Sequence, residues 1–295
     1  MKNLPPLRVA VGLLLCGAMW VAYAHGQQLG QVAAKQQLIK INDDLYVIHN
    51  DFVPGNTTAL ITDEGVVLVD DKFAVDHDSI LAELKKVTSK PIRYVINTHH
   101  HADHSGGNVK MQQMNVQVVS SEQARENMAG SPRDGLFIDT QPGFPNVTFE
   151  NHTQIHLGGR RLELYHFGRA HTSGDIVVYF PAARTLASGD IFVFGDATPQ
   201  LIDYAGGGSA KEWTKTLDSA LQLDFDTVVP GHGIVTTKQE MRKFRDSTLA
   251  LRNRVHEMVV KKKTRDEIAK MLQSDYHWIQ ILLDRSLDGL IGELR

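Results

Sequence analysis

The sequence predicts a mixed α/β fold in which two β-sheets pack back to back and helices cover their outer faces. Short strand patterns alternate with helical patterns, this alternation occurs in two blocks, and each block ends in strand-to-loop turns that carry histidines. No segment is rich enough in linker residues to separate two domains, although 295 residues would allow about two. We therefore expect one domain over 25–295, with a core at about 38–235 and a helical C-terminal extension over 236–295.

The first block is expected to contain strands, one helix and then a further strand. Alternating apolar residues and the turn at Asn42-Asp43-Asp44 predict two strands within 38–49, and 58–62 and 66–70 form a hairpin pattern. Apolar residues at helical spacing predict a helix over 76–87. The apolar run Tyr94-Val95-Ile96 is expected to be a buried strand that leads directly into THHHADH, residues 98–104.

The second block continues this alternation and ends in helices. Residues 130–152 are rich in Gly, Pro, Asn and Asp and are expected to form a long loop. A hydroxyl residue followed three positions later by glutamate predicts the start of a helix at Ser209, Thr237 and Thr264. Strands are expected at 116–119, 153–157, 162–166, 176–180, 185–187 and 227–229, with a polar helix from Ser121.

The first 24 residues have the features of a secretory signal peptide. Lys2 and Arg8 accompany an almost wholly apolar run over 9–21, and Ala22-Tyr23-Ala24 has small residues at its outer positions. This pattern predicts cleavage after Ala24, a periplasmic or secreted protein, and no stable membrane span afterwards. An uncleaved anchor is the alternative, but the apolar run is short for a span of ~20 residues. A lipoprotein signal is disfavoured because it needs a small residue directly before the cysteine, and Leu15 precedes Cys16.

The composition argues against several classes of function. Cys16 is the only cysteine, so the mature chain would have no disulfide, no cysteine nucleophile and no thiolate metal ligand. The net charge is −3 and no basic face dominates, so a nucleic-acid partner is not expected. A small-molecule substrate is the expected partner, and the sequence leaves the oligomeric state open.

THHHADH concentrates four histidines and one aspartate directly after a predicted strand. If the chain stays extended, residues two positions apart face the same side. His99, His101 and Asp103 would then share one face, and His100 would lie on the other as a passenger. Neutral imidazoles together with a carboxylate suit zinc and related metals.

One strand end cannot supply every ligand of a closed metal site, so further ligands must come from elsewhere. Ser105-Gly106-Gly107 favours a sharp turn into a helix, which would let His104 swing back toward the site. His171, Asp190 and His232 each lie at an expected strand end beside glycine or another small residue. These three residues are the candidates to complete the site.

The motif His-x-His-x-Asp-His, followed by His171, Asp190 and His232, resembles the metallo-β-lactamase superfamily over about 38–235. The resemblance implies a four-layer αββα sandwich with a site at one edge for two Zn²⁺ or other divalent ions. It also implies a ligand set: His99, His101 and His171 for the first metal, Asp103, His104 and His232 for the second, and Asp190 between them.

Such a site implies a metal-dependent hydrolase, and the expected signal peptide implies that it is exported. Two metals share a water molecule and lower its pKa toward ~7, and the resulting bridging hydroxide attacks a carbonyl carbon or a phosphorus atom. Asp103 would also orient this nucleophile and is the expected catalytic residue. Asp70 and Asp71 are candidates for fixing the imidazoles, or are turn residues. The expected substrate is a β-lactam, lactone or ester, and the alternative is a phosphodiester or thioester.

Asp190 narrows the resemblance within the superfamily. In the cysteine-bearing β-lactamase subclasses a thiolate occupies this place, and the mature chain has none. The aspartate is similar to that of glyoxalase II, the lactonases and the phosphodiesterase-like members. Lactonases carry a tyrosine shortly after it, whereas Ile191-Phe192-Val193-Phe194 follows here. The basic run Lys261–Lys263 does not match the glutathione-binding motif of glyoxalase II.

Three aromatic residues are candidate substrate contacts. Phe52 belongs to residues 52–56, which are expected to lie as a flap over the metals. Phe194 and Tyr204 belong to the stretch after Asp190, whose glycines at 206–208 would give either a mobile wall or a simple connector.

Two other classes of function compete with the hydrolase. A mononuclear-iron oxygenase or oxidoreductase on the same fold needs only two histidines and one carboxylate, so the presence of all seven positions disfavours it. A binding or accessory protein with a structural metal is disfavoured because the expected binuclear site is complete and open.

Overall fold

The computed structural model describes residues 32–51, 53–130, 143–196, 198–199 and 201–295. The expected signal peptide and Phe52 lie outside the described residues. Within those residues, no helix combines the length and the apolar character that a membrane crossing requires.

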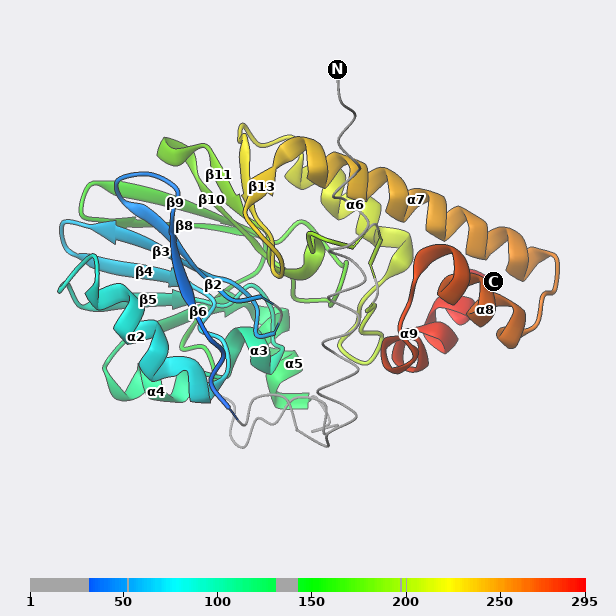
Figure 1. The fold of residues 1–295 in the computed structure, drawn as a ribbon, viewed down its shortest axis with the longest axis horizontal. Helices are drawn as coiled ribbons and strands as arrows, with labels where there is room; N and C mark the ends of the chain where they lie inside the picture. The colour runs from blue at the N-terminus through cyan, green and yellow to red at the C-terminus, as the bar shows by residue number, and fades with distance from the viewer. Residues whose placement is uncertain (1–31, 52, 131–142, 197, 200) are drawn as a thin grey trace, which may run out of the picture.

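Two β-sheets form the centre of the molecule (Figure 1). The first has seven strands in chain order: β1 (Gln37–Lys40), β2 (Leu45–His49), β3 (Thr57–Thr62), β4 (Gly65–Val69), β5 (Ile92–Ile96), β6 (Gln117–Ser121) and β7 (Val147–Phe149). The second has six strands in the spatial order β13 (Thr236–Thr237), β12 (Thr227–Val229), β11 (Thr185–Ala187), β10 (Val177–Phe180), β9 (Arg160–Tyr165) and β8 (His152–Leu157).

Helices supply the connections between parallel strands. The first sheet is parallel from β4 to β7, and only the β11–β12 pair is parallel in the second. The elements beside the first sheet are η1 (Ala74–Asp76), α2 (His77–Lys85), α3 (Ala102–Ser105), α4 (Asn108–Gln113) and α5 (Glu122–Gly130). The later elements are η2 (Pro181–Ala183), η3 (Gly189–Ile191), α6 (Ala210–Ala220), α7 (Lys238–Val260), α8 (Arg265–Tyr276) and α9 (Gln280–Glu293).

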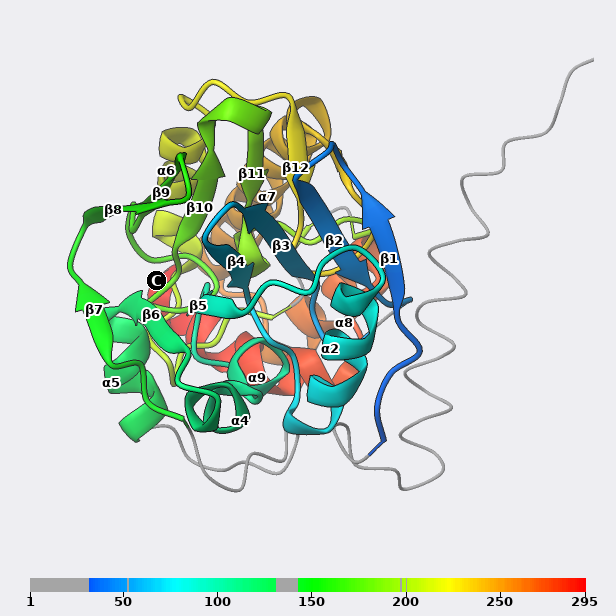
Figure 2. The ribbon, with the colours of Figure 1, turned by 90° about the vertical axis from the view of Figure 1, so that its left-hand side faces the viewer.

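Three apolar clusters separate the four layers. In β4, Val67 and Val69 pack between the sheets, whereas Val66 and Leu68 pack with side chains of α2. Successive residues of β10 divide in the same way, because Val178 lies between the sheets and Val177 lies in the cluster with α6 to α9. Figure 2 shows α2 and α4 on one side of the two sheets and α6 and α7 on the other. The αββα prediction is therefore confirmed.

The predicted helix starts are largely confirmed. Thr264 forms a complete capping box with Glu267, and the Thr237 side chain accepts a hydrogen bond from the backbone N–H of Glu240. The Ser209 side chain likewise accepts from the backbone N–H of Glu212, but the backbone N–H of Ser209 donates to the Ala170 carbonyl instead of to Glu212.

Residues 131–142 of the loop expected over 130–152 lie outside the described residues, and the expectation is wrong at its C-terminal end. The structure places β7 at Val147–Phe149 and begins β8 at His152. β7 has only three residues, which is too short for its alternation of apolar and polar side chains to predict a strand. The two-residue strand β13 was also not predicted.

The parallel strands bring four loops to one edge of the sandwich. Asp70 directly follows β4, and His99 lies three residues after β5. Asp190 and His232 each follow by three residues the ends of β11 and β12, which are parallel neighbours. Because the carboxyl ends of parallel neighbours lie at the same edge, these side chains meet in space.

Candidate metal centre

The histidine-rich stretch is a tight loop followed by a helix. Strand β5 ends at Ile96, and helix α3 already begins at Ala102, with His101 at its N-cap. The Thr98 backbone N–H and hydroxyl donate to the two carboxylate oxygens of Asp70, at 2.7 and 2.8 Å. The entry into the stretch is therefore fixed to the end of β4.

His99, His101 and Asp103 were expected to share one face because an extended chain would place them there, and the structure corrects that reason. The chain is not extended at Asp103, because that residue lies in the first turn of α3. His99 and His101 still lie close together, with ring centroids 4.8 Å apart. The prediction that His100 points to the other side is wrong: its ring centroid lies 4.5 Å from that of His101, and its Nε2 is 3.5 Å from Oδ2 of Asp203.

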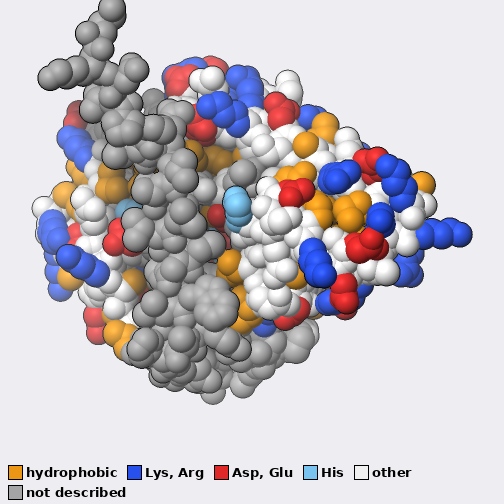
Figure 3. Space-filling view, turned by 45° about the vertical axis from the view of Figure 1, so that its right-hand side comes forward, with side chains coloured by type: hydrophobic (Ala, Val, Ile, Leu, Met, Phe, Trp, Pro, Cys, Tyr) orange, Lys and Arg blue, Asp and Glu red, His pale blue; other side chains and the backbone are white. Residues whose placement is uncertain are grey.

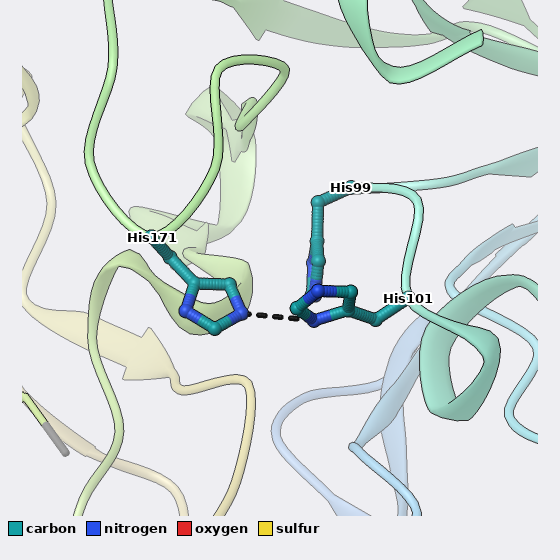
Figure 4. Close-up of side chains that lie close together, drawn as sticks. All are labelled: His99, His101 and His171. Carbon is teal, nitrogen blue, oxygen red and sulfur yellow. Dashed lines mark hydrogen bonds between the residues drawn. The ribbon is translucent and has the colours of Figure 1, made fainter. Parts of the chain in front are cut away.

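Three imidazoles converge to form the first group. The possible ligand atoms of His99, His101 and His171 all lie within 4.8 Å of one another. His171 reaches the group from the loop between β9 and β10, and its Nε2 lies 3.0 Å from Nδ1 of His101 (Figure 4). The other ring nitrogen of His171, Nδ1, is 3.0 Å from the carbonyl oxygen of Leu201 and donates to it.

Asp103, His104 and His232 form the second group. The Nε2 atoms of His104 and His232 lie 3.2 Å apart, and Nε2 of His232 is 3.3 Å from Oδ2 of Asp103. Nδ1 of His104 lies 2.8 Å from Asp70, so this carboxylate orients the ring. Asp70 therefore fixes an imidazole, which was one of the two roles expected for it. Asp71 has the other expected role, because its carboxylate accepts a hydrogen bond from the backbone N–H of Gly107 and holds the turn.

Asp190 lies between the two groups. Its Oδ1 is 3.3 Å from Nε2 of His104, and its Oδ2 is 3.4 and 3.6 Å from Nε2 of His232 and His171. The loop after β12 can approach this closely only with glycine at position 231, since a Cβ there would lie 1.9 Å from Oδ1 of Asp190. All seven predicted ligands are thus brought together.

The arrangement suits divalent metals. His99 is fully buried, and its Nε2 has no hydrogen-bond partner among the described residues. An unpaired buried polar atom is costly, and a bound cation would remove that cost. Imidazole nitrogens and carboxylate oxygens are the donor set that zinc and related ions take. The side chain of His232 is 18% exposed. Figure 3 shows an exposed histidine side chain near the middle of this face, next to a small acidic area.

Two histidines of the first group differ from the second group in their electrostatics. Burial opposes protonation of the third, His101, but the hydrogen bond and charge of Asp203 raise its pKa. Burial, aided by the neighbouring imidazoles, holds the pKa of His99 well below its ordinary value and lowers the pKa of His171 to about 4. Burial also opposes protonation of His232, but the charges of Asp190 and Asp103 raise its pKa to about 10. The carboxylates therefore attract positive charge to the second group, which protons or metal ions can supply.

No sequence pattern indicated Asp203, which supports the first group. Its Oδ2 lies 3.0 Å from Nε2 of His101, so the carboxylate and the first group contact opposite nitrogens of one ring. The burial of Lys72 was also missed. Nζ of Lys72 donates to Oδ1 of Asn50 and to the Gly55 carbonyl, which holds the flap against the ring of His104.

The structure assigns other contacts to two of the predicted substrate residues. The hydroxyl of Tyr204 donates to Glu293 of α9, at 2.9 Å. Phe194 is half-buried against the apolar cluster of α6 to α9, and its backbone N–H donates to the His232 carbonyl. The glycine-rich stretch is tied by Arg169, which donates to the carbonyls of Gly207 and Gly208, and these contacts favour a connector.

Comparison with known proteins places this geometry in a family. The family model described as the metallo-beta-lactamase superfamily matches residues 50–232. A metallo-beta-lactamase type 2 of Elizabethkingia meningoseptica is 26% identical over 213 residues, which cover 69% of this chain and 81% of that protein. One from Bacillus cereus is 26% identical over 202 residues, covering 66% and 73%.

Solved structures agree on the fold. A metallo-beta-lactamase from Pontibacter korlensis has a TM-score of 0.63 at 24% identity and covers 73% of this chain and 99% of that one. The DIM-1 metallo-beta-lactamase has a TM-score of 0.61 at 16% identity, covering 73% and 98%. Because the family model matches residues 50–232, the chain belongs to the metallo-beta-lactamase superfamily, and it is a metal-dependent hydrolase.

Proposed function

We propose that the protein is an exported hydrolase that uses two zinc ions to open a small electrophilic substrate, such as a β-lactam, a lactone or an ester. One observation carries the proposal. The carboxylate of Asp190 lies 3.3–3.6 Å from imidazole nitrogens of both groups. A carboxylate in that position offsets the mutual repulsion of two cations, which a site for one ion would not require.

The residues divide between two ions. The first ion would be held by His99, His101 and His171, and the second by Asp103, His104 and His232. Bound there, two divalent ions would polarise the carbonyl oxygen of the substrate and lower the pKa of water. Asp203 and Asp70 would fix the rings of His101 and His104, because second carboxylates of this kind set imidazole tautomer and direction.

Asp103 is the proposed catalytic residue. It lies in the first turn of α3 beside the second group, with Oδ2 3.3 Å from Nε2 of His232. Burial opposes ionisation of this carboxyl, but the charges of His104 and His232 lower its pKa, so it is a carboxylate at neutral pH. It can therefore accept a hydrogen bond from an attacking water molecule and fix its direction.

The substrate class rests on the relatives. The matched proteins carry the name metallo-beta-lactamase, which supports β-lactams as one class to test. One fold hosts many chemistries, so lactones and esters belong in the same test. Export rests on the pattern of the first 24 residues and is tested separately, by N-terminal sequencing of the periplasmic and secreted fractions, with Ala24–His25 as the expected cleavage point.

The decisive experiment is a hydrolysis screen of residues 25–295 loaded with zinc. Metal content is first measured, and two zinc ions per chain are expected. A chromogenic cephalosporin, an aromatic lactone, a nitrophenyl ester, a thioester and a phosphodiester are then compared with and without a chelator. We expect chelator-sensitive turnover of at least one carbonyl substrate.

Two variants control this screen. His232→Gln removes a proposed ligand, whereas His156→Gln changes an exposed histidine of β8. Loss of the second zinc ion and of turnover in the first variant alone is expected. One iron per chain with oxygen consumption would refute the hydrolytic proposal and favour the oxygenase class. A zinc-loaded protein that hydrolyses none of the five classes would also refute it.

A further inference from the structure

Helix α9 contacts the segment that supports the first group of histidines. This segment, residues 201–209, runs from the loop after η3 into the start of α6. In Figure 1 it passes beside α9, the red helix at the right. The match to the family model ends at residue 232, so α7, α8 and α9 lie outside it.

One side of segment 201–209 faces the candidate metal centre. The Leu201 carbonyl accepts from Nδ1 of His171, and the Asp203 carboxylate lies 3.0 Å from Nε2 of His101. The backbone N–H of Asp203 donates to the His171 carbonyl at 2.9 Å. The segment therefore fixes the direction of two of the three rings in the first group.

The other side of the segment is fastened to α9 by three residues. The Ser286 hydroxyl accepts from the backbone N–H of Ile202 at 2.9 Å. The Glu293 carboxylate accepts from the Tyr204 hydroxyl and from the backbone N–H of Ala210, both at 2.9 Å, and also from the Ser209 hydroxyl.

Gly289 supplies the third contact, by close approach. The Tyr204 ring lies so near that a Cβ on Gly289 would be 2.2 Å from it, so this position of α9 admits only glycine without a shift of the ring. Hydrogen bonds on either side of a close-packed ring leave segment 201–209 little freedom to move relative to α9.

We propose that α9 positions the first metal site, with Glu293 as the principal positioning residue. Glu293 has no contact with the centre itself. It holds segment 201–209, which in turn holds His101 and His171 in the tautomers and directions that leave Nδ1 of His101 and Nε2 of His171 facing each other. This inference rests on the ligand set of the proposed function, and it assigns the C-terminal extension a role in metal affinity.

The test compares Glu293→Ala with Asp288→Ala. Asp288 lies on the same helix, and its exposed carboxylate pairs with Arg265 of α8, so its loss leaves segment 201–209 untouched. We expect Glu293→Ala to weaken binding of the first zinc ion by about tenfold, at the lower end of losses from direct supporting residues. Binding of the second ion, measured in the same competition titration, should change less than twofold. Glu293→Gln retains one acceptor oxygen and should recover most of the affinity.

A second readout needs no metal and no activity. Nitrogen-detected NMR of the metal-free protein, at a pH at which the His101 ring is neutral, reports histidine tautomers, and the wild type should show a proton on Nδ1 of His171 and on Nε2 of His101. Mixed tautomers are expected in Glu293→Ala but not in Asp288→Ala. A general loss of stability would change neither the ratio of the two zinc affinities nor the tautomers of a folded protein.

The outcomes separate the two proposals. The positioning role would be overturned if Glu293→Ala bound both zinc ions as tightly as the wild type does and showed unmixed tautomers. A loss of both zinc ions by the same factor would overturn it as well. A wild type that binds fewer than two ions would contradict the proposed function, and the tautomer comparison would still decide the role of α9.

Discussion

At the scale of single residues, Asp103 connects the fold to the proposed chemistry. It is buried, it lies in the first turn of α3, and its Oδ2 is 3.3 Å from Nε2 of His232. Its carboxylate is held ionised by its neighbours, so it can bind metal and orient water at once. It is the one carboxylate that residues 98–104 contribute to the second group.

Replacing Asp103 with Ala should therefore remove hydrolysis and leave the fold intact. We expect kcat/KM to fall by at least about 100-fold, the lower range for a lost acid–base group. Steady-state kinetics on the substrate found in the screen measures the loss, and far-ultraviolet circular dichroism checks the fold. Turnover unchanged in a folded Asp103→Ala protein would contradict the assigned role.

Lys72 is a second residue with an unusual environment. Its side chain is fully buried, and its ammonium group donates to Asn50 and to the Gly55 carbonyl. Burial lowers its pKa to about 7, although the charges of Asp76, Asp70 and Asp103 oppose the shift. In the unfolded chain a lysine titrates near 10.4, so the folded protein loses its proton at lower pH than the unfolded chain does.

This difference predicts a pH dependence of stability. The cost of burying the protonated amine is fully present below about pH 7 and disappears as pH rises past 10.4, so the wild type gains stability over that interval. Relative to Lys72→Met, its free energy of unfolding should rise with pH by up to about 1.4 kcal/mol per pH unit. Urea unfolding of both metal-free proteins at pH 7, 8, 9 and 10 measures the difference, and a flat difference would refute the assignment.

At the scale of elements, the flap and α3 are fitted to each other at Gly55. The backbone N–H of Gly55 donates to the Asp103 carbonyl, and a Cβ at this position would lie 2.2 Å from Cε1 of His104. The His104 ring cannot move aside without losing its contact with Asp70. Gly55 therefore allows the loop before β3 to lie directly on the second group.

Gly55→Ala should disturb this fit. We expect a loss of about 1–3 kcal/mol in the free energy of unfolding, as for other overpacked sites, together with weaker binding of the second zinc ion. Gly292→Ala is the matched control, because a Cβ there meets nothing within 4 Å and lies in helix α9. That variant should gain about 0.5–1 kcal/mol. Equal stabilities of the two variants would show that the flap does not pack against His104 in solution.

The elements also show which features a sequence can and cannot reveal. Strands such as β4 are buried on both faces, and that burial produces the apolar runs from which they were predicted. The seven ligand candidates were found because each comes after a predicted strand, although β9, which precedes His171, is exposed on one face. The contact between His101 and Asp203 joins residues 102 positions apart, and local patterns do not encode it. His100 was misplaced because strand alternation was extended beyond the end of β5 at Ile96.

At the scale of the whole molecule, the C-terminal helices share one apolar core with the second sheet. The cluster that contains Val177 of β10 and Leu186 of β11 also contains Leu251 of α7, Leu272 of α8 and Leu287 of α9. Removing α8 and α9 would expose part of that core to water. We therefore propose that residues 25–295 form a single folding unit, with the extension as an integral part.

This proposal predicts one cooperative unfolding transition. Trp213 of α6 and Trp278, just before α9, are both buried in this shared core, and they report on α6 and on the start of α9. In Trp278→Phe the fluorescence follows Trp213, and in Trp213→Phe it follows Trp278. For each variant of residues 25–295, the urea midpoints from fluorescence and from far-ultraviolet circular dichroism should coincide, because a single core unfolds as one. An earlier fluorescence transition in Trp213→Phe alone would show that α8 and α9 unfold independently, and α9 could then not hold segment 201–209 rigidly.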